Sequence, residues 1–187
     1  MAKGTTARHV ALLRGVNVGG KNKLPMASLV SYFEELGCLA VRSYIQSGNV
    51  VFDAPAALAA RVSASIAKRI AQEHGLKVPV VVLSHEELAE IAEGNPHVAV
   101  RGVDLAKIYV MFLQDAPSAA KIGTLDPERS PGDELVVRGR AIYLLLRNGA
   151  AKTKLTNDYF DRKLGTVTTS RNWRTVQKLL EMTSSTS

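Results

Sequence analysis

The sequence predicts an α+β fold, with two ferredoxin-like (split βαβ) subdomains in tandem and an amphipathic helix at the C-terminal end. Three observations support this prediction. Residues 9–83 show the element order β-α-β-β-α-β, which is the split βαβ arrangement. The same order recurs in residues 107–169. The chain of 187 residues is 46% hydrophobic and 22% charged, which is typical of a folded globular protein.

The first subdomain is expected to contain four strands and two helices. The strands are apolar or β-branched runs at residues 9–13, 41–45, 50–52 and 78–83, and the last has Pro79 near its start, as edge strands do. The helices have apolar residues three or four positions apart. They begin near Pro25 and near Asp53 and Pro55, and they end at Gly37 and Gly75.

A third helix begins after Ser84, because Ser84 and Glu87 have the spacing of a capping box. It ends at Gly94, and residues 95–106 are expected to link the two subdomains. The predicted subdomains are therefore residues 1–94 and 107–187.

The second subdomain repeats the pattern with shorter elements. Strands are expected at residues 107–113, 134–138, 140–146 and 166–168, and helices at 117–123 and 153–164. Ser170 is expected to cap the final helix. In each subdomain the four strands should form an antiparallel sheet with the spatial order 4-1-3-2.

The net charge is +7, and residues 101–187 contribute most of it, with 14 basic and 9 acidic side chains. A positive field attracts anions such as nucleotides and nucleic acid, although it can also serve only solubility. The single Cys38 excludes an internal disulfide and favours a cytoplasmic location. Apolar runs are much shorter than the ~20 residues that a membrane-spanning helix needs, so neither a membrane span nor a membrane partner is expected. The sequence does not define an oligomeric state.

A glycine-rich loop follows the first strand. Residues 15–21 spell G-x-x-x-x-G-K, the start of a phosphate-binding P-loop, but Asn22 replaces the required Ser or Thr. Pro25 would also interrupt a helix that began directly at Gly20. The loop therefore indicates either an anion-binding loop without hydrolysis or a simple bend after a strand.

The loop and the hairpin turn at residues 46–49 should meet, because the first and second strands of a split βαβ unit run in the same direction. Their polar and glycine residues are the candidate ligand-binding residues of the first subdomain: Arg14, Asn17, Gly19, Gly20, Lys21, Gln46, Ser47 and Asn49. Arg14 is expected to lie against the hairpin, where it either binds a ligand or stabilises the turn.

The final helix has an apolar side, with Trp173, Val176, Leu179 and Leu180, and a basic side, with Arg171, Arg174 and Lys178. Ser170, Arg171 and Asn172 at its start are candidate anion-binding residues. The basic side fits a contact with nucleic acid or a merely solvated surface. Without stacking aromatic residues beside it, any nucleic-acid binding should be weak and non-specific.

Other site types lack support in the sequence. The four histidines are far apart, and no Cys or carboxylate stands at ligand spacing, so no metal site is predicted. No cofactor motif and no nucleophile motif are present, and the catalytic residues, if any, cannot be named. Cys38 follows Gly37 and precedes apolar residues, which indicates a small buried thiol.

Three separated segments resemble the bacterial domain-of-unknown-function 1697 family: residues 10–20 (VALLRGVNVGG), 42–52 (RSYIQSGNVVF) and 168–176 (TTSRNWRTV). Residues 154–157 (KLTN) also fit its pattern, while Thr153 stands where Ser is expected. The resemblance implies two α+β subdomains, the first ferredoxin-like, and it implies no activity.

Taken together, the residues favour a binding module for a small anionic, phosphorylated ligand. Two alternatives remain open: a basic protein associated with nucleic acid, and an enzyme of unknown reaction with a site between the subdomains, where Gln46, Asn49 and Asn172 would position the substrate.

Overall fold

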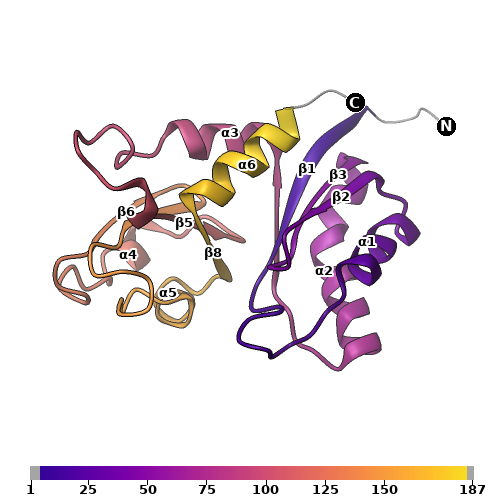
Figure 1. Ribbon diagram of the computed structural model, residues 1–187, viewed down its shortest axis with the longest axis horizontal. Helices are drawn as coiled ribbons and strands as arrows, with labels where there is room; N and C mark the ends of the chain where they lie inside the picture. Colours follow the sequence, from indigo (N-terminus) through magenta and orange to yellow (C-terminus); the bar gives the residue numbers. More distant parts are fainter. Residues whose placement is uncertain (1–4, 185–187) are drawn as a thin grey trace. The chain divides into compact units, whose positions relative to one another are not determined.

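The computed structural model describes residues 5–184 and divides into two compact units (Figure 1). Unit 1 contains the residues up to Ala89 together with those from Leu179 on, and unit 2 is Glu90–Lys178. The chain thus leaves unit 1 inside one helix and returns to it inside another. These are α3 (His85–Glu93) and α6 (Trp173–Ser184). The subdomain limits expected at residues 94 and 106 remain a prediction.

Unit 1 is built on a four-stranded sheet with the order β2-β3-β1-β4. Its strands are β1 (Thr6–Leu13), β2 (Leu39–Tyr44), β3 (Asn49–Pro55) and β4 (Val80–Ser84), and every neighbouring pair is antiparallel. This is the predicted order 4-1-3-2, and it confirms that β4 is an edge strand.

Two helices, α1 (Met26–Glu35) and α2 (Ala56–His74), lie against one face of this sheet (Figure 1). Alternate strand residues point into the core below them, where Leu13, Phe33, Phe52 and Ile66 are at most 1% exposed. The rings of Phe33 and Phe52 contact each other in a tilted arrangement, with their centroids 5.2 Å apart. The lone aromatic residue of the central strands is therefore packed under the helices.

Unit 2 is built on a second four-stranded antiparallel sheet with the order β6-β7-β5-β8. Its strands are β5 (Ile108–Leu113), β6 (Glu134–Arg138), β7 (Ala141–Leu145) and β8 (Thr168–Asn172). Counted within the unit, this order is again 4-1-3-2, so the predicted duplication of the topology is confirmed.

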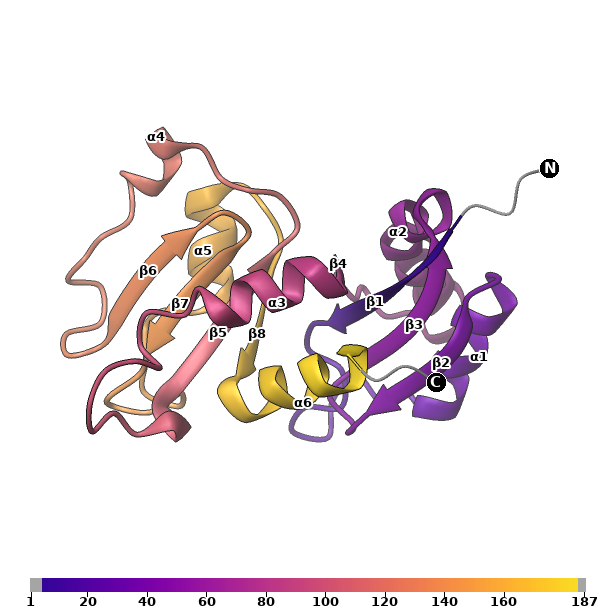
Figure 2. The same cartoon turned by 90° about the horizontal axis from the view of Figure 1, so that it is seen from above.

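Helix α5 (Asn157–Leu164) covers one face of the second sheet, and the short α4 (Ala119–Ile122) lies near it (Figure 2). Phe160 and Leu164 pack there on Met111 and Ile142, all at most 1% exposed. On the other face, the Tyr143 hydroxyl donates to the Ile91 carbonyl at the end of α3 (2.9 Å). A 3-10 helix (Leu105–Lys107) leads into β5.

The predicted capping box at the start of α3 is confirmed. The Ser84 backbone N–H donates to Glu87 Oε2 (2.9 Å), and the Glu87 N–H donates to Ser84 Oγ (3.2 Å). These two bonds satisfy donors that the helix itself leaves free.

Two local predictions are wrong. Ser170 does not cap the last helix, because β8 continues to Asn172 and the Asn172 Oδ1 atom accepts from the Thr175 N–H (2.8 Å). Asp53 does not open α2. It lies in β3 opposite Arg8, whose guanidinium donates to both carboxylate oxygens at 2.6 and 2.9 Å.

Candidate functional site

The predicted meeting of the glycine-rich loop and the hairpin is confirmed. We call residues 14–22 and 45–48 the paired loops. The Leu13 N–H donates to the Gly48 carbonyl (2.8 Å), and the Asn17 amide nitrogen donates to the Gln46 carbonyl (2.8 Å). Both loops thus lie at the same end of the unit 1 sheet, where β1 ends and β3 begins.

The glycine-rich loop closes on itself as a small hairpin. The Asn17 N–H donates to the Asn22 carbonyl (3.1 Å), and the Lys21 N–H donates to the Val18 carbonyl (3.0 Å). At its tip, Gly19 and Gly20 have φ of 57° and 74°, the pair of positive values that a tight two-residue turn needs.

Two asparagine side chains fix this loop. Asn17 donates to the carbonyls of Leu24 and Gln46 and accepts from the Leu24 N–H at 2.9 Å. Asn22 donates to the Gly15 carbonyl (2.9 Å). Both asparagines have positive φ, which asparagine tolerates better than most residues. The loop is therefore braced by its own side chains.

The loop lacks the architecture of a P-loop. In a P-loop the glycine-rich turn runs directly into a helix, whose N-terminal N–H groups face the phosphates. Here α1 begins only at Met26, behind Pro25, and the Asn17 and Lys21 N–H groups are used inside the loop. The geometry gives no support to nucleotide hydrolysis at this loop.

The hairpin turn at residues 45–48 is also held by side-chain hydrogen bonds. Asn49 is fully buried, and its amide donates to the Tyr44 carbonyl (3.0 Å) and to Ser47 Oγ (3.2 Å). Its side chain therefore holds the turn together. Ile45 has a φ of 49°, an outlying value for a β-branched residue, and it is 51% exposed.

The paired loops and Asn49, the first residue of β3, thus contain all candidate residues of the first subdomain, with different exposure. Gly19, Gly20, Lys21 and Gln46 are exposed, Arg14, Asn17 and Ser47 are half-buried, and Asn49 is buried. The sequence analysis missed the apolar side chain of Val18, which is 61% exposed beside this polar set. Nothing in its local pattern distinguishes it from a core valine.

The other candidates, Ser170, Arg171 and Asn172, belong to unit 2 and lie in β8, directly before the first residue of α6. Arg171 is 8% exposed and donates to Thr169 Oγ1 (3.0 Å) and to the Ser170 carbonyl (2.8 Å). Burial lowers the pKa of its guanidinium to about 10. Its predicted place on the basic side of the last helix is wrong.

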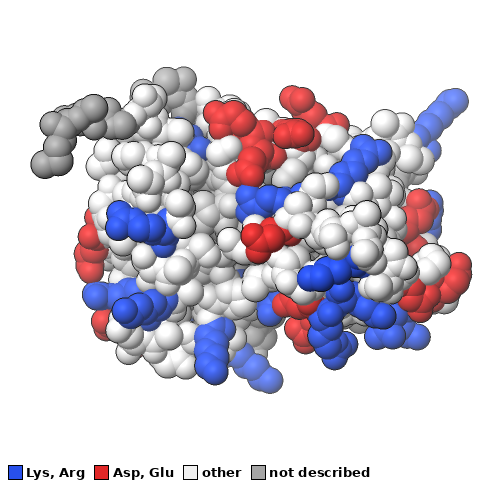
Figure 3. Space-filling view, turned by 180° about the vertical axis from the view of Figure 1, so that it is seen from behind, with Lys and Arg blue, Asp and Glu red and all other residues white. Residues whose placement is uncertain are grey.

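The basic side of α6 is therefore reduced to Arg174, which is exposed, and Lys178, which is half-buried. On the face of the molecule in Figure 3, basic side chains lie at several places, with acidic side chains among them. Phosphate contacts along a nucleic acid require several neighbouring cations. Neither observation favours a nucleic-acid interface.

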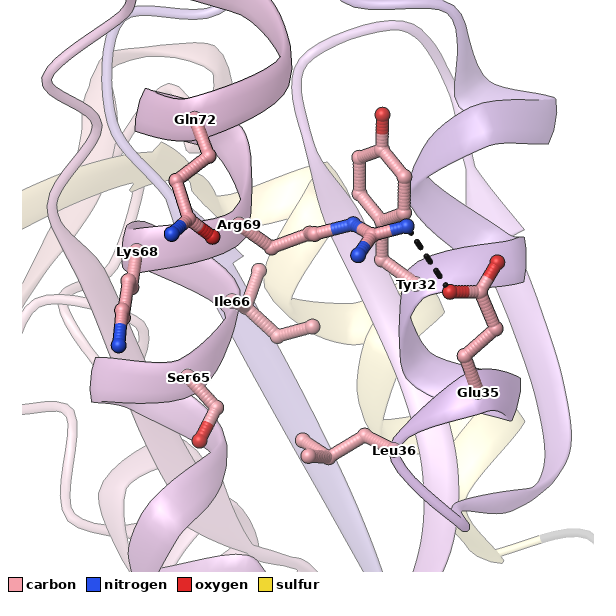
Figure 4. A pocket seen from close by; sticks show the side chains of 8 residues that line it. All are labelled: Tyr32, Glu35, Leu36, Ser65, Ile66, Lys68, Arg69 and Gln72. Atoms are coloured by element: carbon pink, nitrogen blue, oxygen red, sulfur yellow. Dashed lines mark hydrogen bonds and ion pairs between the residues drawn. The ribbon is translucent and has the colours of Figure 1, made fainter.

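A groove of about 310 Å³ separates α1 from α2 (Figure 4). Arg69 reaches across it from α2, lies over the Tyr32 ring with its guanidinium carbon 5.2 Å from the centroid, and donates to Glu35 (3.1 Å). It also pairs with Glu73 at 3.4 Å. Arg69 thus joins the two helices.

Among residues 5–184, no three His, Cys, Asp or Glu side chains are grouped so that they could hold a metal ion. In the same range, no helix combines the length and the apolar character needed to cross a membrane.

The profile of a family described as "Protein of unknown function (DUF1697)" matches residues 6–143. The solved structure of a conserved bacterial protein from Streptococcus pneumoniae is similar over 96% of this chain and 99% of that chain, with a TM-score of 0.72 and 26% sequence identity. Curated proteins gave no significant match.

Proposed function

This chain belongs to the DUF1697 family, and we propose that it is a binding protein for a small anionic, phosphorylated ligand, which the paired loops of unit 1 receive. The family is described as one of unknown function, so the proposal depends on the geometry of these loops.

One observation carries it. Gly19 and Gly20 are exposed, both have left-handed backbone, and within residues 5–184 their N–H groups form no hydrogen bond. Successive free N–H groups in such a turn make a concave surface that suits an anionic oxygen. The adjoining Lys21 side chain is also exposed and adds a full positive charge.

The bracing of the loop supports the same function. Because Asn17 and Asn22 already hold the turn, ligand binding costs little ordering of the backbone. Glycine at both tip positions leaves the space above the turn open, since no atom lies within 4 Å of a Cβ added at either one. A phosphate group can therefore approach the backbone closely.

Arg14 is the second cation of the proposed site. It follows β1 directly, its backbone N–H donates to the Pro79 carbonyl (3.0 Å), and its side chain is half-buried. We assign it the role of a second charged contact for the ligand. Lys21 and Arg14 together match a doubly charged phosphate better than a monoanion.

The test is thermal unfolding with inorganic pyrophosphate, compared with sodium chloride at equal ionic strength. We expect pyrophosphate to raise the melting temperature, by the equivalent of about 2.7 kcal/mol when its concentration is 100 times Kd. Lys21→Gln should remove this gain. Lys68→Gln, a change of an exposed lysine on α2, is the matched control and should retain it.

The proposal fails if pyrophosphate and chloride have the same effect on the wild-type protein. It also fails if Lys21→Gln and Lys68→Gln reduce the rise in melting temperature equally, because a general response to positive charge would then explain that rise.

A further inference from the structure

Unit 2 has a cavity of about 390 Å³. It lies between the 3-10 helix before β5 and the first turn of α6, and its walls are Leu105, Ala106, Asn172, Trp173, Arg174 and Gln177. Sites for small molecules begin at about 300 Å³, so the cavity has room for a ligand of about one aromatic ring.

One side of the cavity is apolar. Leu105 is 45% exposed, although large aliphatic side chains are usually buried, and the small Ala106 beside it leaves space. Trp173, which is 6% exposed, contributes an aromatic surface. A flat apolar group placed here would cover Leu105 and rest against an aromatic ring, and both contacts remove apolar surface from water.

Trp173 also has an unsatisfied polar atom. Its indole N–H is buried and finds no hydrogen-bond partner within residues 5–184. The indole nitrogen can only donate, so the missing partner is an acceptor. A buried donor without an acceptor is uncommon in proteins.

The formal charge and the helix dipole at the cavity are both positive. Arg174 is exposed at its rim, and no carboxylate is among the lining residues. The start of α6, a helix of 12 residues, adds the positive end of the helix dipole. Asn172 already serves as the cap, since it accepts from the Thr175 N–H.

We propose that this cavity binds a small aromatic carboxylic acid. The ring lies between Leu105 and Trp173, and the carboxylate pairs with Arg174 at the start of α6. Because Arg174 is the single formal charge in the lining, a monoanion fits better than a phosphate, which carries nearly two negative charges. This site is independent of the paired loops.

The chain offers a direct probe, because Trp173 is its only tryptophan. Its fluorescence is followed while phenylacetate is added into the millimolar range, in parallel with acetate and with the neutral phenylacetamide. We expect a saturable change with phenylacetate, none with acetate, and binding of phenylacetamide weaker by about tenfold because the ion pair is missing.

Substitutions then locate the site. Arg174→Gln should weaken phenylacetate by about tenfold and leave phenylacetamide unchanged, because it removes only the charge. Ala106→Phe should abolish both by filling the cavity. Arg162→Gln on α5 is the matched control and should bind as the wild type does, and so should Lys21→Gln in the paired loops.

The proposal is overturned if phenylacetate gives no saturable change, or if acetate gives the same change. It is also overturned if Arg174→Gln and Arg162→Gln bind phenylacetate equally well. If Ala106→Phe does not fold, the comparison of the two arginine variants still decides.

Discussion

Gly48 lies directly against Leu13, at the point where the hairpin closes over the end of β1. A Cβ atom added to Gly48 would come within 2.7 Å of both Leu13 Cβ and Val16 Cγ2, and the residue has a φ of 76°. The contact between the paired loops therefore requires glycine for two reasons, space and backbone conformation.

Gly48→Ala should lower the free energy of unfolding by about 3 kcal/mol, from overpacking together with left-handed backbone strain. Gly20→Ala is the control, because its φ of 74° is nearly the same but no atom lies within 4 Å of an added Cβ. It should cost about 1 kcal/mol. Urea unfolding measures both, and equal losses would show that the close contact is unimportant.

Asn17→Asp tests the bracing of the glycine-rich loop with almost no change in shape. The new carboxylate oxygen would face the carbonyls of Leu24 and Gln46, which now accept from the amide. We expect a loss of about 3 kcal/mol in unfolding free energy. Asn22→Asp, which loses one bond to Gly15 at an exposed position, should cost about 1 kcal/mol. If Asn22→Asp lowered the unfolding free energy more than Asn17→Asp, the assigned role of Asn17 as the main brace of the loop would be contradicted.

Much of the fold could be predicted because local signals agree with the topology. The capping box at Ser84 and Glu87 and the helix end at Gly75, which has a left-handed backbone, appear as expected. The strand order followed from the split βαβ pattern, since one element order and the right-handed crossover leave few arrangements.

The errors arose where pairing with a distant strand decided the structure. Thr168–Asn172 is polar, so it resembles a cap followed by a helix, but its pairing with β5 makes it a strand and buries Arg171. In the same way Asp53 resembles a helix start until Arg8, 45 residues away, is placed opposite it. Neither partner can be read from local sequence.

For the candidate site, the sequence identified the loops but not the function of each side chain. The polar pattern alone could not show that the side-chain amides of Asn49 and Asn17 would donate hydrogen bonds to neighbouring backbone carbonyls. It also gave no sign of the cavity at the start of α6, because Leu105 and Trp173 are 68 positions apart and meet only in the fold.

Cys38 should be unreactive in the folded protein. It is 3% exposed, and burial raises the pKa of its thiol from 9.0 to about 11. At pH 8 a thiol reagent such as Ellman's reagent should therefore modify no thiol in the native chain and one after denaturation. Rapid modification of the native protein would contradict this burial.

The same shift predicts a pH dependence of stability. Between pH 9 and about 11 the unfolded chain loses the thiol proton while the folded chain keeps it. Unfolding free energy should therefore fall as the pH rises through this interval. Cys38→Ala should reduce that fall relative to the wild type, which urea unfolding across the interval would measure.

Arg171 is a buried cation whose pKa is lowered by burial, so its charge is costly in the fold. Arg171→Met keeps most of the volume and removes the charge, and we expect its unfolding free energy to stay within about 1 kcal/mol of the wild type. Arg171→Ala should cost about 3 kcal/mol through the cavity it leaves. If both variants lose the same amount, the polar contacts of the guanidinium outweigh its desolvation.

The division of the chain has a consequence during synthesis on the ribosome. Unit 1 uses residues up to Ala89 and again from Leu179, where Met182 accepts from Arg42 and Thr183 contacts His85. All of Glu90–Lys178 must be translated between these parts, which takes roughly 5–20 s at about 5–20 residues per second. Unit 2, a continuous stretch, has its whole sheet available once Asn172 has been made. The second unit can therefore finish folding on the nascent chain before the first.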